Sequence, residues 1–247
     1  MTTLENGKTF GIYVMSYQRS DKIITQDLFE YCTYIVREDE VEKYRANGVR
    51  NLLVIPKDCP CWNFMDTLWW TIWNTKEDVI FIADDDIRYF SYRTDKSTPI
   101  TSDNYRDPVA TATEEIERIG CLLSDLNLGM AYDGPQKALY CYDKEFGFKG
   151  MCGHCRWINK SGLKAKYDYK DVASSDIDMV FQELLMNRIT IQPKYFLSNA
   201  GSMETNKGGV TMTRRQTVAL RIEIENKWWP YYEYDAKKNI GKINIKR

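Results

Sequence analysis

Long apolar segments are missing from this sequence of 247 residues. No stretch approaches the roughly 18 uninterrupted apolar residues that a membrane-spanning helix requires, and the opening residues MTTLENGKTF lack the apolar region of a secretory signal. We therefore expect a cytoplasmic protein with no membrane partner. In that compartment the seven cysteines are expected to be reduced thiols, without structural disulfides.

An excess of one charge is missing as well. Lys and Arg together number 34 and Asp and Glu 35, so attraction to nucleic acid would have to come from local patches. The end of the chain is one such patch, with Arg214, Arg215, Arg221, Lys227, Lys237, Lys238, Lys242, Lys246 and Arg247. A solvated surface is the ordinary interpretation, and contact with a polynucleotide backbone is the alternative.

Internal repeats and low-complexity segments are also absent, and apolar runs of strand length alternate with amphipathic segments. We predict strands that begin near residues 11, 31, 49 and 78, and helices over 21–31, 38–48, 63–78, 111–127 and 174–189. This order predicts an α/β fold with a mostly parallel sheet flanked by helices. In such sheets, ligands bind beyond the carboxyl ends of the strands.

Three consecutive acids, Asp84, Asp85 and Asp86, follow the buried-strand pattern VIFIA at residues 79–83. Adjacent carboxylates repel one another unless a cation neutralises them. Mg²⁺ and Mn²⁺ prefer oxygen ligands and leave coordination positions for water or for substrate phosphates. The triplet therefore predicts a site for Mn²⁺ or Mg²⁺ and a diphosphate, and the alternative is an acidic loop that caps a helix.

The acid triplet resembles the Asp-x-Asp motif of glycosyltransferases with the GT-A fold, which follows the fourth strand of a Rossmann-like half and binds a nucleotide sugar. The resemblance implies that Asp86 binds the metal most directly and that Asp84 assists it, through water or the nucleotide. It also implies that Asp85 approaches the ribose. The donor would be a nucleoside diphosphate sugar, and we expect a UDP-sugar.

The segment MSYQRS extends the resemblance, because many such enzymes place a Ser-Tyr-x-Arg turn after the first strand, against the nucleobase and phosphates. The matching residues are Ser16, Tyr17 and Arg19. By the same resemblance the chain is one GT-A domain. Its residues from about 10 to 90 would bind the donor, those from about 91 to 230 the acceptor, and 231–247 would form a basic tail.

A second acidic pair, Asp176 and Asp178, opens the predicted helix over 174–189. The pair is similar to the acidic motif with which inverting GT-A enzymes activate the acceptor hydroxyl, so both residues are candidates for the catalytic base. The alternative for Asp176 is a helix acid that interacts with the dipole.

Two further side chains are candidates for substrate contact. Lys207 lies in NKGGV, where glycine backbone and a positive charge suit a phosphate, although an ordinary turn has the same composition. Trp157 follows CGHCR and is the tryptophan that we assign to the acceptor pocket, because aromatic rings stack on sugars and bases. Most of the other tryptophans are expected in the core.

The chain has one histidine, His154, and it precedes the second acidic pair. Many GT-A enzymes instead contribute a C-terminal histidine to the metal. This departure leaves the metal with Asp86, phosphates and water, or with a residue near ETNKGGV. The segments CPC at 59–61 and CGHC at 152–155 match a zinc site poorly, because the first spacing is too short.

The predicted activity is metal-dependent transfer of a hexosyl or pentosyl group from a nucleoside diphosphate sugar to a hydroxyl acceptor. The pattern is also similar to small phage-type GT-A enzymes, which implies a hydroxymethylated base in DNA as the acceptor and a host cytoplasm as the location. Two alternatives stay open. A nucleotidyltransferase would use Mg-NTP, although MSYQRSDK lacks the glycine expected of its first loop, and a non-catalytic nucleic-acid-binding protein would use the basic tail.

Overall fold

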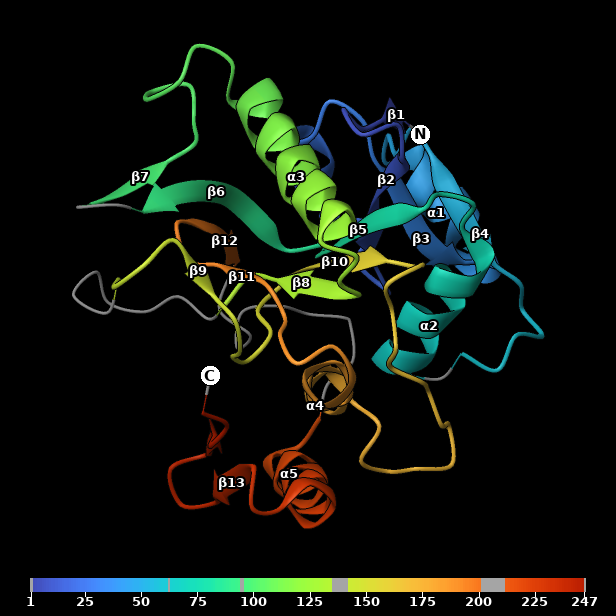
Figure 1. Ribbon diagram of the computed structural model, residues 1–247. Coiled ribbons are helices and arrows are strands. Elements are labelled where there is room, and N and C mark those ends of the chain that lie inside the picture. Colours follow the sequence, from blue (N-terminus) through green and yellow to red (C-terminus); the bar gives the residue numbers. More distant parts are fainter. Residues whose placement is uncertain (1, 62, 94–95, 135–141, 201–211, 247) are drawn as a thin grey trace.

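A seven-stranded sheet forms the centre of the molecule, with six strands side by side in the order β4, β3, β2, β5, β10 and β8 (Figure 1). The computed structural model describes residues 2–61, 63–93, 96–134, 142–200 and 212–246. In sheet order, the six strands are Leu52–Ile55, Thr33–Arg37, Thr9–Met15, Val79–Asp84, Cys155–Asn159 and Met130–Tyr132. The short β1 (Thr2–Thr3) pairs with β2.

The first four strands in this order are parallel, and β10 runs antiparallel to both of its neighbours, β5 and β8. β5 lies in the middle, and its residues 79–83 have no exposed surface. This burial on both faces explains why its sequence is a continuous apolar run rather than an alternating one. The predicted class, a mixed α/β fold with a mostly parallel sheet, is confirmed.

Helices cover both faces of the sheet. These helices are α3 (Pro108–Asp125) on one face, and α2 (Phe64–Asn74) and α4 (Asp176–Met186) on the other. Ile119 of α3 packs in one core cluster with Phe81 of β5. Leu68 of α2 packs in the other cluster with Ile82 of the same strand. Successive residues of β5 therefore contact different helices, as the pleat of a strand requires.

The predicted helix over 21–31 is wrong, because only the 3₁₀ turn η1 (Thr25–Leu28) forms there. Tertiary contacts take the backbone donors that a longer helix would use. The N–H of Gln26 donates to the Tyr34 hydroxyl at 3.1 Å, and the N–H of Glu30 donates to Thr113 Oγ1 of α3 at 3.1 Å.

The predicted helix over 38–48 is present in part, as the 3₁₀ turn η2 (Glu38–Glu40) followed by α1 (Val41–Ala46). Gly48 follows the helix with a φ of 87°, in the left-handed region that favours glycine. The N–H of Val49 then donates to the Tyr44 carbonyl at 3.1 Å. This bond closes the helix in the manner expected of a C-terminal glycine.

The second half of the chain adds smaller elements around the sheet. They are β6 (Ile87–Arg93), β7 (Ser97–Pro99), β9 (Phe146–Gly147), β11 (Gln192–Pro193), β12 (Phe196–Ala200), α5 (Arg214–Trp228), β13 (Tyr232–Asp235) and β14 (Ile240–Ile243). β12, β6 and β7 form a second sheet that begins directly after the acid triplet. In the part of the chain that the structure describes, no helix is both long and apolar enough to cross a membrane.

The basic end of the chain is packed against the rest of the fold. β13 and β14 form an antiparallel hairpin, and Tyr232 of β13 is fully buried in a cluster with Phe181 of α4 and Ile224 of α5. Among the cysteines of the described residues, all six are free thiols.

Candidate metal and nucleotide site

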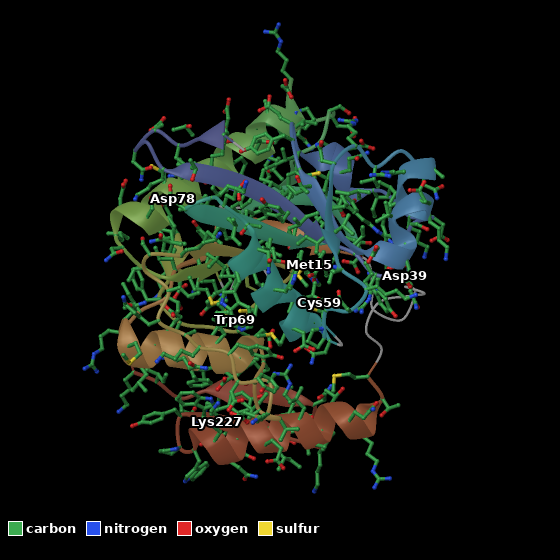
Figure 2. The ribbon with its side chains drawn as sticks, turned by 90° about the vertical axis from the view of Figure 1, so that its right-hand side faces the viewer. Met15, Asp39, Cys59, Trp69, Asp78 and Lys227 are labelled. Atoms are coloured by element: carbon green, nitrogen blue, oxygen red, sulfur yellow. The ribbon has the colours of Figure 1, made fainter. Side chains whose placement is uncertain are left out.

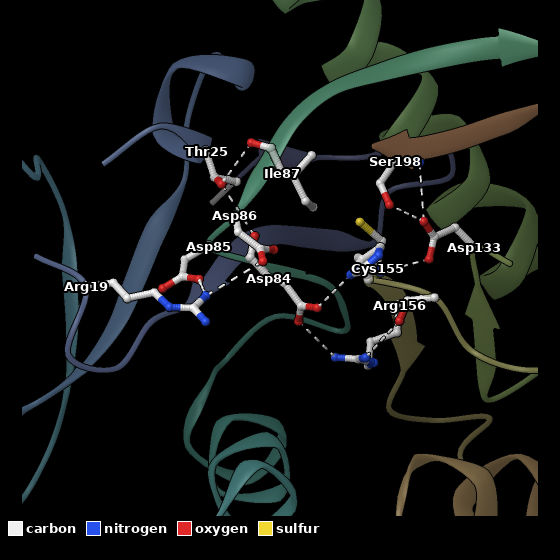
Figure 3. Close-up of polar contacts among 12 residues, drawn as sticks. Arg19, Thr25, Asp84, Asp85, Asp86, Ile87, Asp133, Cys155, Arg156 and Ser198 are labelled. Atoms are coloured by element: carbon white, nitrogen blue, oxygen red, sulfur yellow. Dashed lines mark hydrogen bonds and ion pairs between the residues drawn. The ribbon is translucent and has the colours of Figure 1, made fainter. Parts of the chain in front are cut away.

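The acid triplet lies where the chain leaves the central sheet for the second one. Asp84 is the last residue of β5, Asp85 and Asp86 form the turn, and β6 begins at Ile87. The parallel pairing of β2 with β5 extends to Met15 and Asp84, so the turn lies beside the residue that follows β2. Figure 3 shows the three carboxylates and their partners.

Asp84, Asp86 and His154 each offer one atom that could bind a metal, and these three atoms lie within 4.8 Å of one another. The Nδ1 atom of His154 is 3.2 Å from Asp84 Oδ2, and the Asp84 N–H donates to the His154 carbonyl at 3.1 Å. The side chains of Asp84 and His154 are 30% and 38% exposed, so a ligand can reach them. These three residues, which we call the metal group, include both predicted metal ligands, Asp84 and Asp86, and add His154, which the sequence did not assign to the metal.

The pairing of β10 with β5 places the histidine. Cys155, the first residue of β10, pairs with Ala83 of β5, so His154 stands opposite Asp84. A buried carboxylate fixes this turn, because Asp133 Oδ1 accepts the Cys155 N–H at 2.8 Å. A Cβ added at Gly153 would lie 2.5 Å from the same Asp133 oxygen, so only glycine fits there.

The electrostatics of the metal group favour a cation. Burial, and next the charge of Asp84, raise the pKa of Asp86 above its ordinary value. The hydrogen bond that His154 makes to the Asp84 carboxylate raises the pKa of His154, although burial opposes this shift. A divalent cation between these groups would relieve the carboxylate repulsion and displace the imidazole proton. Two carboxylates and one imidazole therefore fit a cation such as Mn²⁺.

The residues after β2 form a connected set around Asp85. Ser16 Oγ donates to Asp85 Oδ2 at 2.5 Å, and Arg19 Nη1 lies 2.5 Å from Asp85 Oδ1 and 3.8 Å from Asp86. Asp85 is only 5% exposed, and burial raises its pKa while Ser16 and Arg19 oppose that shift. This burial does not fit the expected contact of Asp85 with ribose. Asp85 instead fixes Arg19 beside the metal group.

Tyr17 lies at the surface next to this set and is 40% exposed. A cleft of about 340 Å³ lies beside it, lined by Tyr17, Gln18, Ser20, Asp39, Glu40 and Lys43. The cleft lies beyond the carboxyl ends of β2 and β3, which is the usual place for a nucleotide in an open α/β sheet.

The second acidic pair divides into two different environments. Asp178 is 2% exposed, and it accepts hydrogen bonds from Trp228 Nε1 at 2.7 Å and from Gln182 Nε2 at 2.8 Å. Lys227 of α5 lies 2.8 Å from Asp178 Oδ1, and Figure 2 shows this lysine where α5 lies along α4. Asp178 therefore joins two helices, and its predicted role as a base is corrected.

Asp176 is the first residue of α4 and is half-buried. Its charge acts on Arg156 of β10, and Arg156 Nη1 lies 3.9 Å from Asp84 Oδ1. Arg156 is thus close enough to feel the charges of both Asp84 and Asp176.

Trp157 is fully buried, and its Nε1 donates to the Ile116 carbonyl of α3 at 2.8 Å. Its ring centroid is 4.7 Å from that of Phe81. A side chain without exposed surface cannot stack on an acceptor, so this assignment is also corrected. Lys207 lies outside the described residues.

No protein-family model and no curated protein matches the sequence. Solved structures do resemble the fold. Glucosyl-3-phosphoglycerate synthase from M. tuberculosis is 11% identical, with a TM-score of 0.50 over 90% of this chain and 80% of that chain. Its complex with Mn²⁺, UDP-glucose and glycerol 3-phosphate is 11% identical, with a TM-score of 0.48 over 80% of this chain and 74% of that chain. S. aureus TarS (residues 1–349) is 12% identical, with a TM-score of 0.45 over 88% of this chain and 66% of that chain.

At these identities the likeness concerns the fold and not the reaction. The sheet order, with an antiparallel β10 beside β5, and the match of TM-score 0.50 agree on the architecture. The chain has the fold of the GT-A glycosyltransferases.

Proposed function

We propose that this protein transfers a sugar from a nucleoside diphosphate sugar to a hydroxyl acceptor, with a divalent metal held by Asp84, Asp86 and His154. The observation that carries the proposal is the convergence of these three side chains at the end of β5. The mycobacterial synthase of similar fold is named for glucosyl transfer and was crystallised with Mn²⁺ and UDP-glucose. We extend that class of donor, a UDP-sugar, to this chain.

The nucleotide would lie on the side of the metal group where Ser16, Tyr17 and Arg19 are found. When bound, the metal supplies positive charge to the diphosphate that leaves the sugar. Arg19 adds a second positive charge, because Asp85 fixes it 3.8 Å from Asp86. The exposed ring of Tyr17 borders the cleft in which a nucleobase would lie. Lys207 stays a sequence-based candidate for phosphate contact.

Asp176 is the candidate for the general base. Its carboxylate would accept the proton of the acceptor hydroxyl as that oxygen bonds to the anomeric carbon, while the bond from that carbon to the diphosphate oxygen breaks. Its half-buried place at the start of α4, where its charge acts on Arg156, supports this role. Asp178 has no such access.

The donor set favours Mn²⁺ over Mg²⁺. Mg²⁺ binds through oxygen and keeps several waters, whereas imidazole suits transition metals better. Asp84 and Asp86 supply the oxygens and His154 the nitrogen.

A hydroxymethylated DNA base as the acceptor, the choice between hexosyl and pentosyl transfer, and a cytoplasmic location stay predictions from the sequence. The similar structures give the DNA acceptor no support. Of the basic residues near the end of the chain, Lys227 is paired with Asp171 at 2.5 Å and with Asp178 at 2.8 Å. That lysine is therefore part of the fold, and its charge is not available to a phosphate backbone.

A thermal-shift panel of nucleotide sugars, with Mn²⁺ or with EDTA, tests the proposal. A donor at about 100 times its Kd stabilises the native state by about 2.7 kcal/mol, which raises the Tm of a chain of this size by roughly 5–10 °C. We expect this rise with a UDP-sugar and Mn²⁺, and no rise in EDTA. A larger shift with nucleoside triphosphates would favour a nucleotidyltransferase instead, and shifts that ignore Mn²⁺ would contradict the metal-dependent reaction.

A further inference from the structure

Two thiols lie in contact in the loop between β4 and α2. The Sγ atoms of Cys59 and Cys61 are 3.1 Å apart, and Figure 2 shows Cys59 beside α2. The backbone makes a tight turn around Pro60, because the Cys61 N–H donates to the Cys59 carbonyl at 2.8 Å. A hydrogen bond of this span holds the first and third residues of the turn close together. Backbone and sulfur atoms of the two cysteines therefore converge.

The two thiols differ in their access to solvent. Cys59 is half-buried, and its neighbours Asp58 and Pro60 are exposed. Cys61 is only 4% exposed, and its carbonyl accepts a hydrogen bond from Arg37 Nη1 of β3. A reagent in solution can therefore reach Cys59, while Cys61 is fixed within the fold.

The acidity of Cys61 agrees with this difference. Burial, and next the hydrogen bond with Cys59, raise the pKa of Cys61 to about 12. Because the thiolate is the nucleophile in thiol chemistry, Cys61 reacts poorly with a dissolved reagent. A neighbour already in contact reacts far more readily, since oriented groups behave as if at effective concentrations that can reach about 10⁵ M. Cys61 is therefore suited to a second, internal step that follows reaction at Cys59.

From these observations we infer that Cys59 and Cys61 are a redox-active pair that forms a reversible disulfide by exchange with a small-molecule disulfide. The Cys59 thiolate attacks one sulfur of the dissolved disulfide and bonds to it, and the other half leaves as a thiol. The Cys61 thiolate then attacks the Cys59 sulfur and releases the second thiol. The two protons of the protein thiols end on the two released thiols, so the pair is oxidised and the dissolved disulfide is reduced.

The geometry of the loop favours a disulfide that opens again. Only Pro60 separates the two cysteines, so the bond would close a small ring. Strained disulfides are the ones that reductants open readily. The sulfur atoms must also approach from 3.1 Å to the roughly 2.0 Å of a disulfide. Residues 56–58 are exposed and have room for this adjustment. Reduced glutathione should therefore restore the two thiols.

Mass spectrometry can follow the pair directly, because trypsin releases both cysteines in one peptide, residues 58–76, that contains no other cysteine. The full chain is incubated with mixtures of reduced and oxidised glutathione, quenched in acid, alkylated with N-ethylmaleimide in denaturant and digested. The masses distinguish two free thiols, a glutathione adduct and an internal disulfide. We compare the wild type with Cys59→Ser, Cys61→Ser and the control Cys121→Ser, which removes a half-buried thiol of α3.

We expect the wild type and Cys121→Ser to form the internal disulfide as oxidised glutathione increases, and to lose it when reduced glutathione is added. Cys61→Ser should stop at the glutathione adduct on Cys59. The wild type should hold at least about tenfold less of that adduct, because internal attack outpaces attack by dissolved thiols. Cys59→Ser should form an adduct more slowly than Cys61→Ser, because Cys61 is buried. The two variants test separate steps, so either one is informative should the other fail to fold.

Three results would overturn the inference. The first is a wild type that keeps both thiols free at every ratio of the two forms of glutathione. The second is a stable glutathione adduct on Cys59 of the wild type, which would show that Cys61 does not displace it. The third is a disulfide that joins Cys59 or Cys61 to a different cysteine.

Discussion

Replacing Asp86 with alanine should abolish Mn²⁺-dependent binding of a UDP-sugar. Asp86 supplies one of the three ligand atoms that lie within 4.8 Å of one another. The loss of partners that only support metal ligands typically costs about 10–100-fold in metal affinity, so the loss of a ligand itself should cost at least about 100-fold. In the proposed function the metal holds the diphosphate, so calorimetric titration with the donor should show the same loss.

An exposed acid on the loop after β7 offers a matched control. Asp103→Ala also removes one carboxylate, and Asp103 is outside the metal group. The control should keep the wild-type donor affinity in Mn²⁺, and circular dichroism should show that both variants are folded. Unchanged donor affinity in a folded Asp86→Ala protein would remove the metal from this site.

Replacing Asp176 with asparagine should lower kcat by about 10²–10⁴-fold, the usual contribution of a general base. The metal group and the Ser16–Arg19 set do not include Asp176, so the affinity for UDP and Mn²⁺ should not change. Release of UDP from a UDP-sugar with water as the acceptor provides an assay that needs no knowledge of the natural acceptor.

Asp178→Asn gives the contrasting result, because the same change two residues along affects stability. Removing one partner of a buried ion pair costs about 3–5 kcal/mol, and the partial exposure of Lys227 reduces this to about 2–3 kcal/mol. The Tm should fall by roughly 4–12 °C, while the release of UDP at low temperature stays near that of the wild type. The opposite pattern, a stable but inactive Asp178→Asn and an active Asp176→Asn, would exchange the two roles.

The sequence predicts the centre of this fold well, because the signals there are local. Residues 79–83 form an apolar run that suits a strand buried on both faces, and the acids begin where that run ends. The apolar residues of α2 and α4 recur at helical spacing, and the side chains of Asn63 and Ser175 cap the amino ends of these helices. In these segments, propensity and packing favour the same structure.

The sequence-based predictions that differ from the structure concern side chains whose role depends on partners far away in the sequence. His154 joins the metal group only because 155–159 pair antiparallel with 79–83, and no local pattern gives that register. The one sequence signal for this role is that His154 directly precedes a strand. Asp178 differs from Asp176 through Lys227 and Trp228, about 50 residues further along the chain. Trp157 is buried because β10 is a central strand, which its glycine-rich approach does not indicate.

The most direct test of a metal-dependent glycosyltransferase site is a crystal grown with Mn²⁺ and UDP and measured at the manganese absorption edge. We predict one anomalous peak at about 2.0–2.3 Å from a carboxylate oxygen of Asp84 or Asp86, from a ring nitrogen of His154 and from oxygens of the diphosphate. A peak elsewhere, or UDP bound at the end of β5 with no manganese beside it, would contradict the account.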